Sequence, residues 1–272
     1  MKRTIRILLL VFFSLLLLVS AWKIIDIQTS YRVGENSYSS LKQYISLPEA
    51  SPVPIETDTP PTTEATWQQP QTEPVVTDDT VWPIVDFEAL REINPDIVGW
   101  IYIEGTDISY PVVQGKDNSY YLKRLFDGSY NSSGCIFLDS NCPKNFTAQH
   151  SIIYGHNMRN DTMFAGLMEY KEQSYFNEHP VALLLTPTRK YKIMLFSGYI
   201  ANPSSNAWRL DFSDGTFEYW LANIAGRSGF VSDIYPTEDD QIATLSTCTY
   251  EYDGALFVLH GILRDCGEYG TT

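Results

Sequence analysis

The sequence predicts a mainly β domain, an eight-stranded closed or nearly closed barrel with peripheral helices. Three observations support this fold. Eight short β-prone runs follow one another, turn-forming Gly, Pro, Asn and Asp separate them, and few helical patterns intervene. The expected strands are 97–103, 108–113, 134–138, 151–154, 181–185, 191–199, 242–247 and 256–263.

The first 25 residues are predicted to anchor the chain in a membrane. Basic residues precede the unbroken apolar and small stretch 7–22, which spans ~24 Å as a helix at ~1.5 Å per residue. Including Ile24 and Ile25 brings the helix to about bilayer thickness. The basic residues predict a single-pass protein with a cytoplasmic N-terminus and an extracellular domain. A cleaved signal peptide is the alternative, because residues 19–21 resemble a cleavage site.

Three further segments follow the expected anchor. Residues 26–45 are predicted to form a juxtamembrane segment, and 46–82 an acidic stalk rich in Pro and Thr. The stalk contains seven acidic residues and no Lys or Arg, so it buries too little apolar surface to order itself. We expect an extended spacer there. Residues 83–272 are long enough for one folded domain with its own core.

Two helices are expected in this domain. The first covers residues 86–93 and ends before Asn94–Pro95. The second covers residues 217–224, where apolar side chains recur at i, i+3, i+4 and i+7. It is expected to pack on the barrel between the seventh and eighth strands. The net charge of −14 argues against a nucleic-acid partner.

Cys248 and His156 are the candidate catalytic residues. Cys248 ends one expected strand and His156 follows another, so each side chain is held rigidly and can face a cleft. A thiol becomes a strong nucleophile when an imidazolium stabilises its thiolate, and the same imidazolium can protonate a leaving amine. The remaining histidines, His150, His179 and His260, are weaker candidates by position, and His260 is expected to be packed or surface-facing within a strand.

The other cysteines give no sign of a metal or cofactor. The chain has four cysteines, too few for a disulfide framework at this length. Cys135 and Cys142 either pair across a short loop or stay free, and Cys266 is expected to be unpaired. The spacing fits no zinc knuckle, and no Gly-rich phosphate loop occurs. We therefore expect no cofactor and no metal.

Two motifs resemble those of sortases. Residues 244–248, Thr-Leu-Ser-Thr-Cys, match the TLxTC signature, and residues 153–158, Ile-Tyr-Gly-His-Asn-Met, are similar to the histidine motif. Segments 108–115, 117–122 and 134–139 make the chain most similar to class B. The resemblance implies an eight-stranded barrel and an extracellular cysteine transpeptidase of the cell wall or pilus, typical of Gram-positive bacteria.

The resemblance also implies the reaction and its partners. The thiolate would attack the Thr carbonyl of a C-terminal sorting signal on a surface protein or pilin and form a thioester. An amine of peptidoglycan or of another pilin would then resolve the thioester. Thr247 is an implied substrate-binding residue beside the nucleophile.

The sequence departs from the sortase pattern at one position. The family places an arginine, which binds substrate and stabilises the oxyanion, at about Leu256, and no arginine lies between Cys248 and Leu263. Arg264 lies about 26 Å further along a strand at ~3.3 Å per residue, whereas Arg209 and Arg227 are left as possible replacements. Losing such a donor costs ~2.7–4 kcal/mol. Three functions therefore stay open: an active transpeptidase, a non-catalytic assembly factor that binds sorting signals, and a hydrolytic peptidase.

Overall fold

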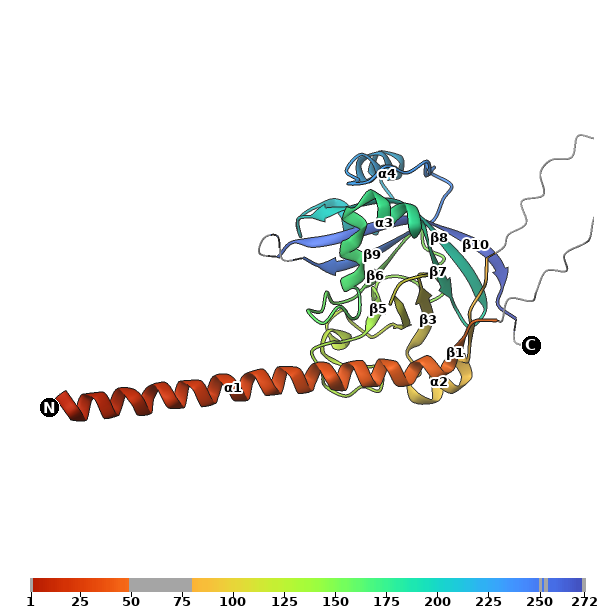
Figure 1. Cartoon of the computed structure of the whole chain (residues 1–272). Coiled ribbons are helices and arrows are strands. Elements are labelled where there is room, and N and C mark those ends of the chain that lie inside the picture. The colour runs from red at the N-terminus through yellow and green to blue at the C-terminus, as the bar shows by residue number, and fades with distance from the viewer. Residues whose placement is uncertain (1, 49–79, 250, 252–253, 271–272) are drawn as a thin grey trace, which may run out of the picture.

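The core of the protein is a closed barrel of eight strands (Figure 1). The computed structural model describes residues 2–48, 80–249, 251 and 254–270. Around the barrel the strand order is β10-β8-β7-β3-β4-β5-β6-β9. The strands are β3 (Ile97–Tyr102), β4 (Ser109–Val113), β5 (Ile136–Leu138), β6 (His150–Tyr154), β7 (Val181–Leu185), β8 (Arg189–Ala201), β9 (Ile242–Cys248) and β10 (Leu256–Glu268).

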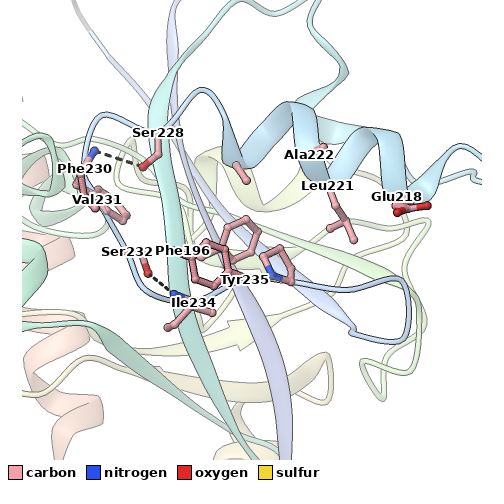
Figure 2. Close-up of a pocket in the computed structure, with 12 residues that line it drawn as sticks. Phe196, Glu218, Leu221, Ala222, Ser228, Phe230, Val231, Ser232, Ile234 and Tyr235 are labelled. Carbon is pink, nitrogen blue, oxygen red and sulfur yellow. Dashed lines mark hydrogen bonds between the residues drawn. The ribbon is translucent and has the colours of Figure 1, made fainter.

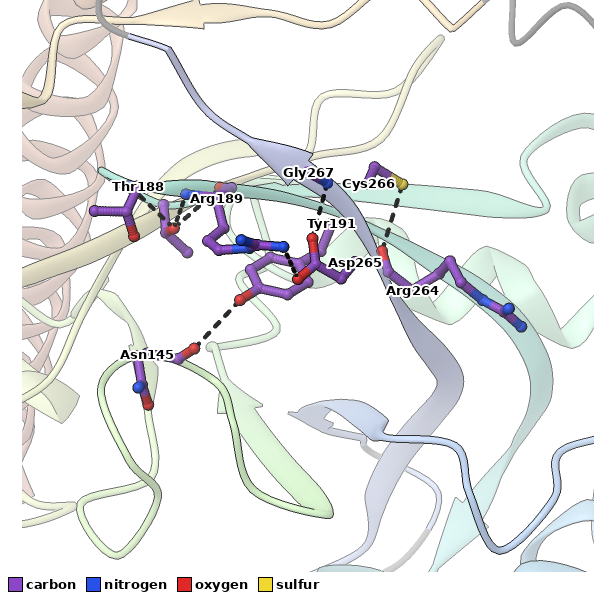
Figure 3. Close-up of polar contacts among 9 residues, drawn as sticks. Asn145, Thr188, Arg189, Tyr191, Arg264, Asp265, Cys266 and Gly267 are labelled. Carbon is purple, nitrogen blue, oxygen red and sulfur yellow. Dashed lines mark hydrogen bonds and ion pairs between the residues drawn. The ribbon is translucent and has the colours of Figure 1, made fainter.

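All eight strands expected from the sequence take part in this barrel, and the fold class is confirmed. The differences lie at strand ends. β10 continues beyond residue 263 to Glu268 because it stays paired with β8, with Asp265 opposite Tyr191. An ion pair between Arg189 and Asp265 links these two strands (Figure 3). The strand expected at 134–138 begins instead at Ile136, as β5. The backbone is not extended at Gly134, where φ is 58°.

Both expected helices form. Helix α2 (Phe87–Ile93) begins after Asp86, whose carboxylate accepts a hydrogen bond from the Ala89 amide at 2.9 Å. Helix α4 (Phe217–Ala225) packs on the outer face of β8, β10 and β9 through the apolar side predicted from its sequence. The helical elements that the sequence did not specify are α3 (Gln173–Glu178) and the short 3₁₀ turns η1 (Lys42–Tyr44), η2 (Tyr120–Lys123), η3 (Ala165–Lys171) and η4 (Asn206–Trp208).

Helix α1 (Lys2–Leu41) runs without a break across the expected boundary between anchor and juxtamembrane segment. Its N-terminal half extends away from the barrel, whereas its C-terminal half lies along it (Figure 1). Within the described residues, it is the one helix long and apolar enough to cross a membrane. A short sheet of β1 (Ile45–Ser46) and β2 (Ile84–Val85) follows. Most of the expected stalk, residues 49–79, lies outside the described residues.

Candidate active site

Parallel pairing of β6 with β9 brings His156 and Cys248 to one edge of the barrel. In this pair Tyr154 lies opposite Ser246. His156 lies two residues after Tyr154, and Cys248 lies two residues after Ser246. The paired ends of β6 and β9 therefore bring the two residues close to one another. The register continues past β6, because the Gly155 amide donates to the Ser246 carbonyl at 3.0 Å.

A mostly apolar pocket of about 220 Å³ surrounds these two residues. Phe137 and Tyr154 form one side, with ring centroids 5.3 Å apart. Cys248 is exposed and His156 partly exposed, so a ligand can reach both. The complete lining is Asn118, Leu122, Phe137, Tyr154, Gly155, His156, Ser246, Thr247, Cys248 and Leu256. All four site residues expected from the sequence are therefore brought together.

The imidazole of His156 is oriented by a backbone carbonyl. Its Nε2 lies 2.7 Å from the carbonyl oxygen of Leu122. A carbonyl oxygen only accepts hydrogen bonds, so Nε2 carries the proton, and Nδ1 is the nitrogen left to exchange a proton with another group. The sequence did not reveal this role of Leu122, because a backbone oxygen leaves no signature in residue type.

Within the described ranges, no cationic side chain forms a hydrogen bond with the Cys248 sulfur. Partial burial raises the pKa of this thiol above the ordinary value. Among the described residues, no hydrogen bond joins the Cys248 sulfur to His156. The Asn157 side-chain amide instead donates to the Cys248 carbonyl at 3.0 Å. The raised pKa favours the protonated thiol, so we expect thiolate formation to be coupled to proton transfer to a neighbouring base such as the imidazole.

Leu256 stands beside Cys248, where the expected arginine would lie. The two residues are directly paired between β10 and β9, and Leu256 is half-buried in the pocket wall. This position contributes apolar surface and no hydrogen-bond donor from its side chain.

The arginines considered as replacements are engaged elsewhere. Arg209 pairs with Asp214 at 2.6 Å and donates to the Asp211 carbonyl, and Arg227 lies over the Tyr199 ring. Arg264 lies 3.7 Å from Asp240, near the far end of β10 (Figure 3). None of the three lines the pocket.

Thr247 carries a hydroxyl with no partner in the described part of the chain. The side-chain oxygen is buried and makes no hydrogen bond there, although Thr247 lines the pocket. An unpartnered buried hydroxyl costs free energy. The oxygen has almost no accessible surface, so it can contact a bound carbonyl oxygen only if the side chain rotates towards the pocket.

A larger pocket, of about 430 Å³, lies between α4, β8 and residues 228–236 (Figure 2). Phe196, Leu221 and Ile234 give it an apolar floor. Its lining contains no cysteine or histidine. The smaller pocket is therefore the candidate active site, because Cys248 and His156, the residues expected to supply a nucleophile and an acid–base group, both line it.

The remaining histidines have structural roles. His150 Nδ1 lies 2.7 Å from the Arg209 carbonyl, and Thr244 Oγ1 lies 2.7 Å from both His150 Nε2 and His260 Nδ1. Both imidazoles are buried. Burial lowers the pKa of His150 to about 4, and burial, aided by the neighbouring His150, lowers the pKa of His260 well below its ordinary value. His179 binds the Glu104 carbonyl at 2.8 Å.

The cysteines other than Cys248 are also free. Cys135 and Cys142 are buried thiols, so the disulfide considered from their spacing does not form here, and Cys266 is unpaired as expected. No group of three or more His, Cys, Asp or Glu side chains suited to a metal ion occurs in the described ranges.

Comparisons with known proteins identify relatives with this architecture. The chain is 37% identical over 167 residues to sortase B of Staphylococcus aureus, covering 61% of this chain and 68% of that protein. The solved Staphylococcus aureus sortase B–substrate complex has a TM-score of 0.63 and 34% identity, covering 66% of this chain and 85% of the other. A sortase B complexed with triglycine also has a TM-score of 0.63 and 34% identity, covering 66% and 86%. No protein-family model matches the sequence.

Proposed function

We propose that this chain, which belongs to the class B sortase family, is an active transpeptidase with Cys248 as nucleophile and His156 as acid–base group. The observation that carries the proposal is the shared pocket at the matched ends of β6 and β9. The nucleophile and the proton carrier come from separate strands, yet they meet where a peptide has access to both.

The reaction has two stages. First, His156 Nδ1 takes the Cys248 proton, and the thiolate attacks the carbonyl carbon of a sorting-signal threonine. The peptide C–N bond breaks as the imidazolium returns a proton to the leaving amine, which leaves a thioester. Next, an acceptor amine gives a proton to the imidazole and attacks the thioester, so the thiolate leaves and a new amide forms.

The Thr247 hydroxyl is the proposed donor to the substrate carbonyl oxygen as negative charge develops there. It is buried and unpartnered within the described residues, and it is adjacent to the nucleophile. Leu256 supplies apolar contact to the substrate. A single neutral donor stabilises an oxyanion less than a guanidinium does, so we expect slow turnover.

The proposed setting is the outer face of a cell membrane. The N-terminal half of helix α1 is apolar enough to cross a membrane, and the basic residues that precede its apolar stretch 7–22 favour a cytoplasmic N-terminus. Substrates would be secreted proteins or pilins with a C-terminal sorting signal. The acceptor would be an amine of peptidoglycan or a pilin, and the triglycine complex of a relative supports an amine-bearing glycine peptide.

The test is to incubate the chain with a panel of sorting-signal peptides and an amine, then to seek a thioester at Cys248 by mass spectrometry. We expect the thioester in wild type and none in Cys248→Ala, whereas Cys266→Ala, which alters a free cysteine outside the pocket, should behave as wild type. Identical products from wild type and Cys248→Ala would refute the proposal. The ratio of ligated to hydrolysed product separates transpeptidase from peptidase.

A second candidate function is binding of sorting signals without turnover. The raised pKa of the Cys248 thiol and the apolar side chain of Leu256 favour it. This alternative predicts peptide binding that survives Cys248→Ala, together with no thioester in wild type. Calorimetric binding measured beside the mass spectra therefore distinguishes an assembly factor from an enzyme.

A further inference from the structure

We propose that Tyr38 of helix α1 is a positioning residue for the His156 imidazole, acting through Gly134 and the Leu122 carbonyl. The contacts form a continuous path from the helix to the active site. This inference rests on the proposed acid–base role of His156, and it adds a function for the helix that continues from the expected membrane span.

The C-terminal part of α1 docks against residues 131–135. Gly34, Tyr38 and Leu41 are buried and recur at helical spacing on one face. The Asn131 side-chain amide donates to the Ser30 carbonyl at 2.9 Å. At Gly34 a Cβ atom would collide with the Ser133 side chain, so glycine permits the close approach of helix and loop.

Tyr38 makes the contact nearest to the active site. Its side chain is 6% exposed, and its hydroxyl donates to the Gly134 carbonyl and lies 3.3 Å from the Cys135 sulfur. The Tyr110 ring packs edge-on against it, with centroids 5.4 Å apart. The hydroxyl is therefore held in place and fixes the position of the Gly134 peptide.

Gly134 in turn touches the groups that orient the imidazole. Its φ is +58°, and a Cβ there would lie 2.8 Å from the Leu122 carbonyl oxygen and 3.0 Å from His156 Cδ2. The Cys135 amide donates to the Tyr121 carbonyl at 2.9 Å, which fastens the two chain segments together. A shift of the Gly134 peptide therefore changes both the acceptor of the Nε2 proton and the space available to the ring.

Two variants test this path in the full chain, purified in detergent. Tyr38→Phe removes the hydroxyl and keeps the ring, so the fold is retained. Tyr31→Phe is the matched control, because it makes the same change on the same helix at a hydroxyl without a hydrogen bond to any described residue. The measurements are the rate and pH profile of thioester formation, kcat and KM, and the pH titration of His156 by NMR with labelled histidine.

We expect Tyr38→Phe to lower kcat about three- to tenfold, as loss of one hydrogen bond implies, with little change in KM. The pH profile and the His156 titration should shift together, while Tyr31→Phe should match wild type. Gly134→Ala should disturb the His156 resonance more strongly, because the added methyl enters the same space.

The proposal is overturned if Tyr38→Phe leaves kcat, the pH profile and the His156 titration as in wild type. An equal change in Tyr31→Phe would also overturn it, since the effect would then come from general loosening of the helix. The NMR titration needs no turnover. If wild type and Cys248→Ala gave the same products, the proposed function would fail while the titration still decided the role of Tyr38.

Discussion

Replacing Leu256 with arginine should accelerate thioester formation strongly. Leu256 and Cys248 are directly opposite one another on antiparallel strands, and opposite Cα atoms in such a pair are ~4.5–5.5 Å apart. Both residues line the same pocket. An arginine at this position can therefore place its guanidinium within ~5 Å of the sulfur or of a substrate oxygen bound to it.

The magnitude follows from two effects. At ~5 Å a unit charge interacts with the thiolate by ~0.8 kcal/mol in water and ~3 kcal/mol at an effective dielectric constant of 20. Cys248 is exposed, so we take about 1 kcal/mol, which lowers the thiol pKa by about 0.7 unit and gives roughly fivefold more thiolate. A donor aimed at the oxyanion contributes ~2.7–4 kcal/mol. Together these predict an increase of at least about a hundredfold.

The assay compares single-turnover thioester formation by quench and mass spectrometry in wild type, Leu256→Arg, Leu256→Lys and Leu256→Met. Lysine supplies a positive charge without the planar guanidinium and its paired hydrogen-bond donors, whereas methionine keeps an apolar side chain similar in volume to leucine. We expect thioester formation to be fastest in Leu256→Arg, slower in Leu256→Lys, and equal to wild type in Leu256→Met. Adding Cys248→Ala to Leu256→Arg should abolish the signal.

A rate for Leu256→Arg equal to that of Leu256→Met, in a protein with unchanged thermal stability, would refute this reasoning. It would mean that residue 256 does not face the reacting atoms in solution, despite its register with Cys248.

Three further predictions follow from the same structure. Thr247→Val should lower the thioester-formation rate about tenfold or more while Thr247→Ser retains most of it, as measured by the same quench assay; equal rates would remove Thr247 as the oxyanion donor. The alkylation rate of Cys248 by iodoacetamide, scored by peptide mass spectrometry, should keep rising with pH through and beyond neutrality, because burial raises its pKa; a plateau from pH 6 would instead reveal an imidazolium–thiolate pair. The free energy of unfolding should fall as pH drops below about 6.5, because unfolded histidine binds a proton there whereas buried His150 does so only at about 4. This contribution is on the order of 3 kcal/mol, fully present above pH 6.5 and lost towards pH 4, and urea unfolding curves of wild type against His150→Gln, which should show a shallower pH slope, would test it.

The strands and two helices of the barrel domain could be predicted from the sequence because strand periodicity, helical periodicity and turn residues are local signals. Residues 181–185 matched β7 at both ends, and Asp86 marked the start of α2. Strand pairing is not local, so the parallel match of β6 with β9, which explains why His156 meets Cys248, came only from the structure.

Two other features needed coordinates for different reasons. The Leu122 carbonyl is backbone, so residue type gives no hint that it orients the imidazole. The docking of α1 had a signal, since Gly34, Tyr38 and Leu41 recur at helical spacing. That signal was obscured because the much stronger apolar run of the expected anchor precedes it on the same helix.

The activation of the Cys248 thiol and the placement of the His156 imidazole are expected to be coupled. Burial raises the pKa of the Cys248 thiol, and no described cationic side chain forms a hydrogen bond with its sulfur, so under the proposed mechanism its activation depends on proton transfer to His156. A guanidinium at this position would stabilise both thiolate and oxyanion, so we expect the rate of a site that contains one to depend less on imidazole placement. Here Leu256 offers no such support, so the rate should depend steeply on the orientation set by Leu122 and Gly134. The Tyr38 contact should therefore matter less in a Leu256→Arg background than in wild type, and a double-mutant cycle of Tyr38→Phe with Leu256→Arg measures that coupling. Strict additivity of the two effects would show that imidazole placement and charge stabilisation limit the reaction independently.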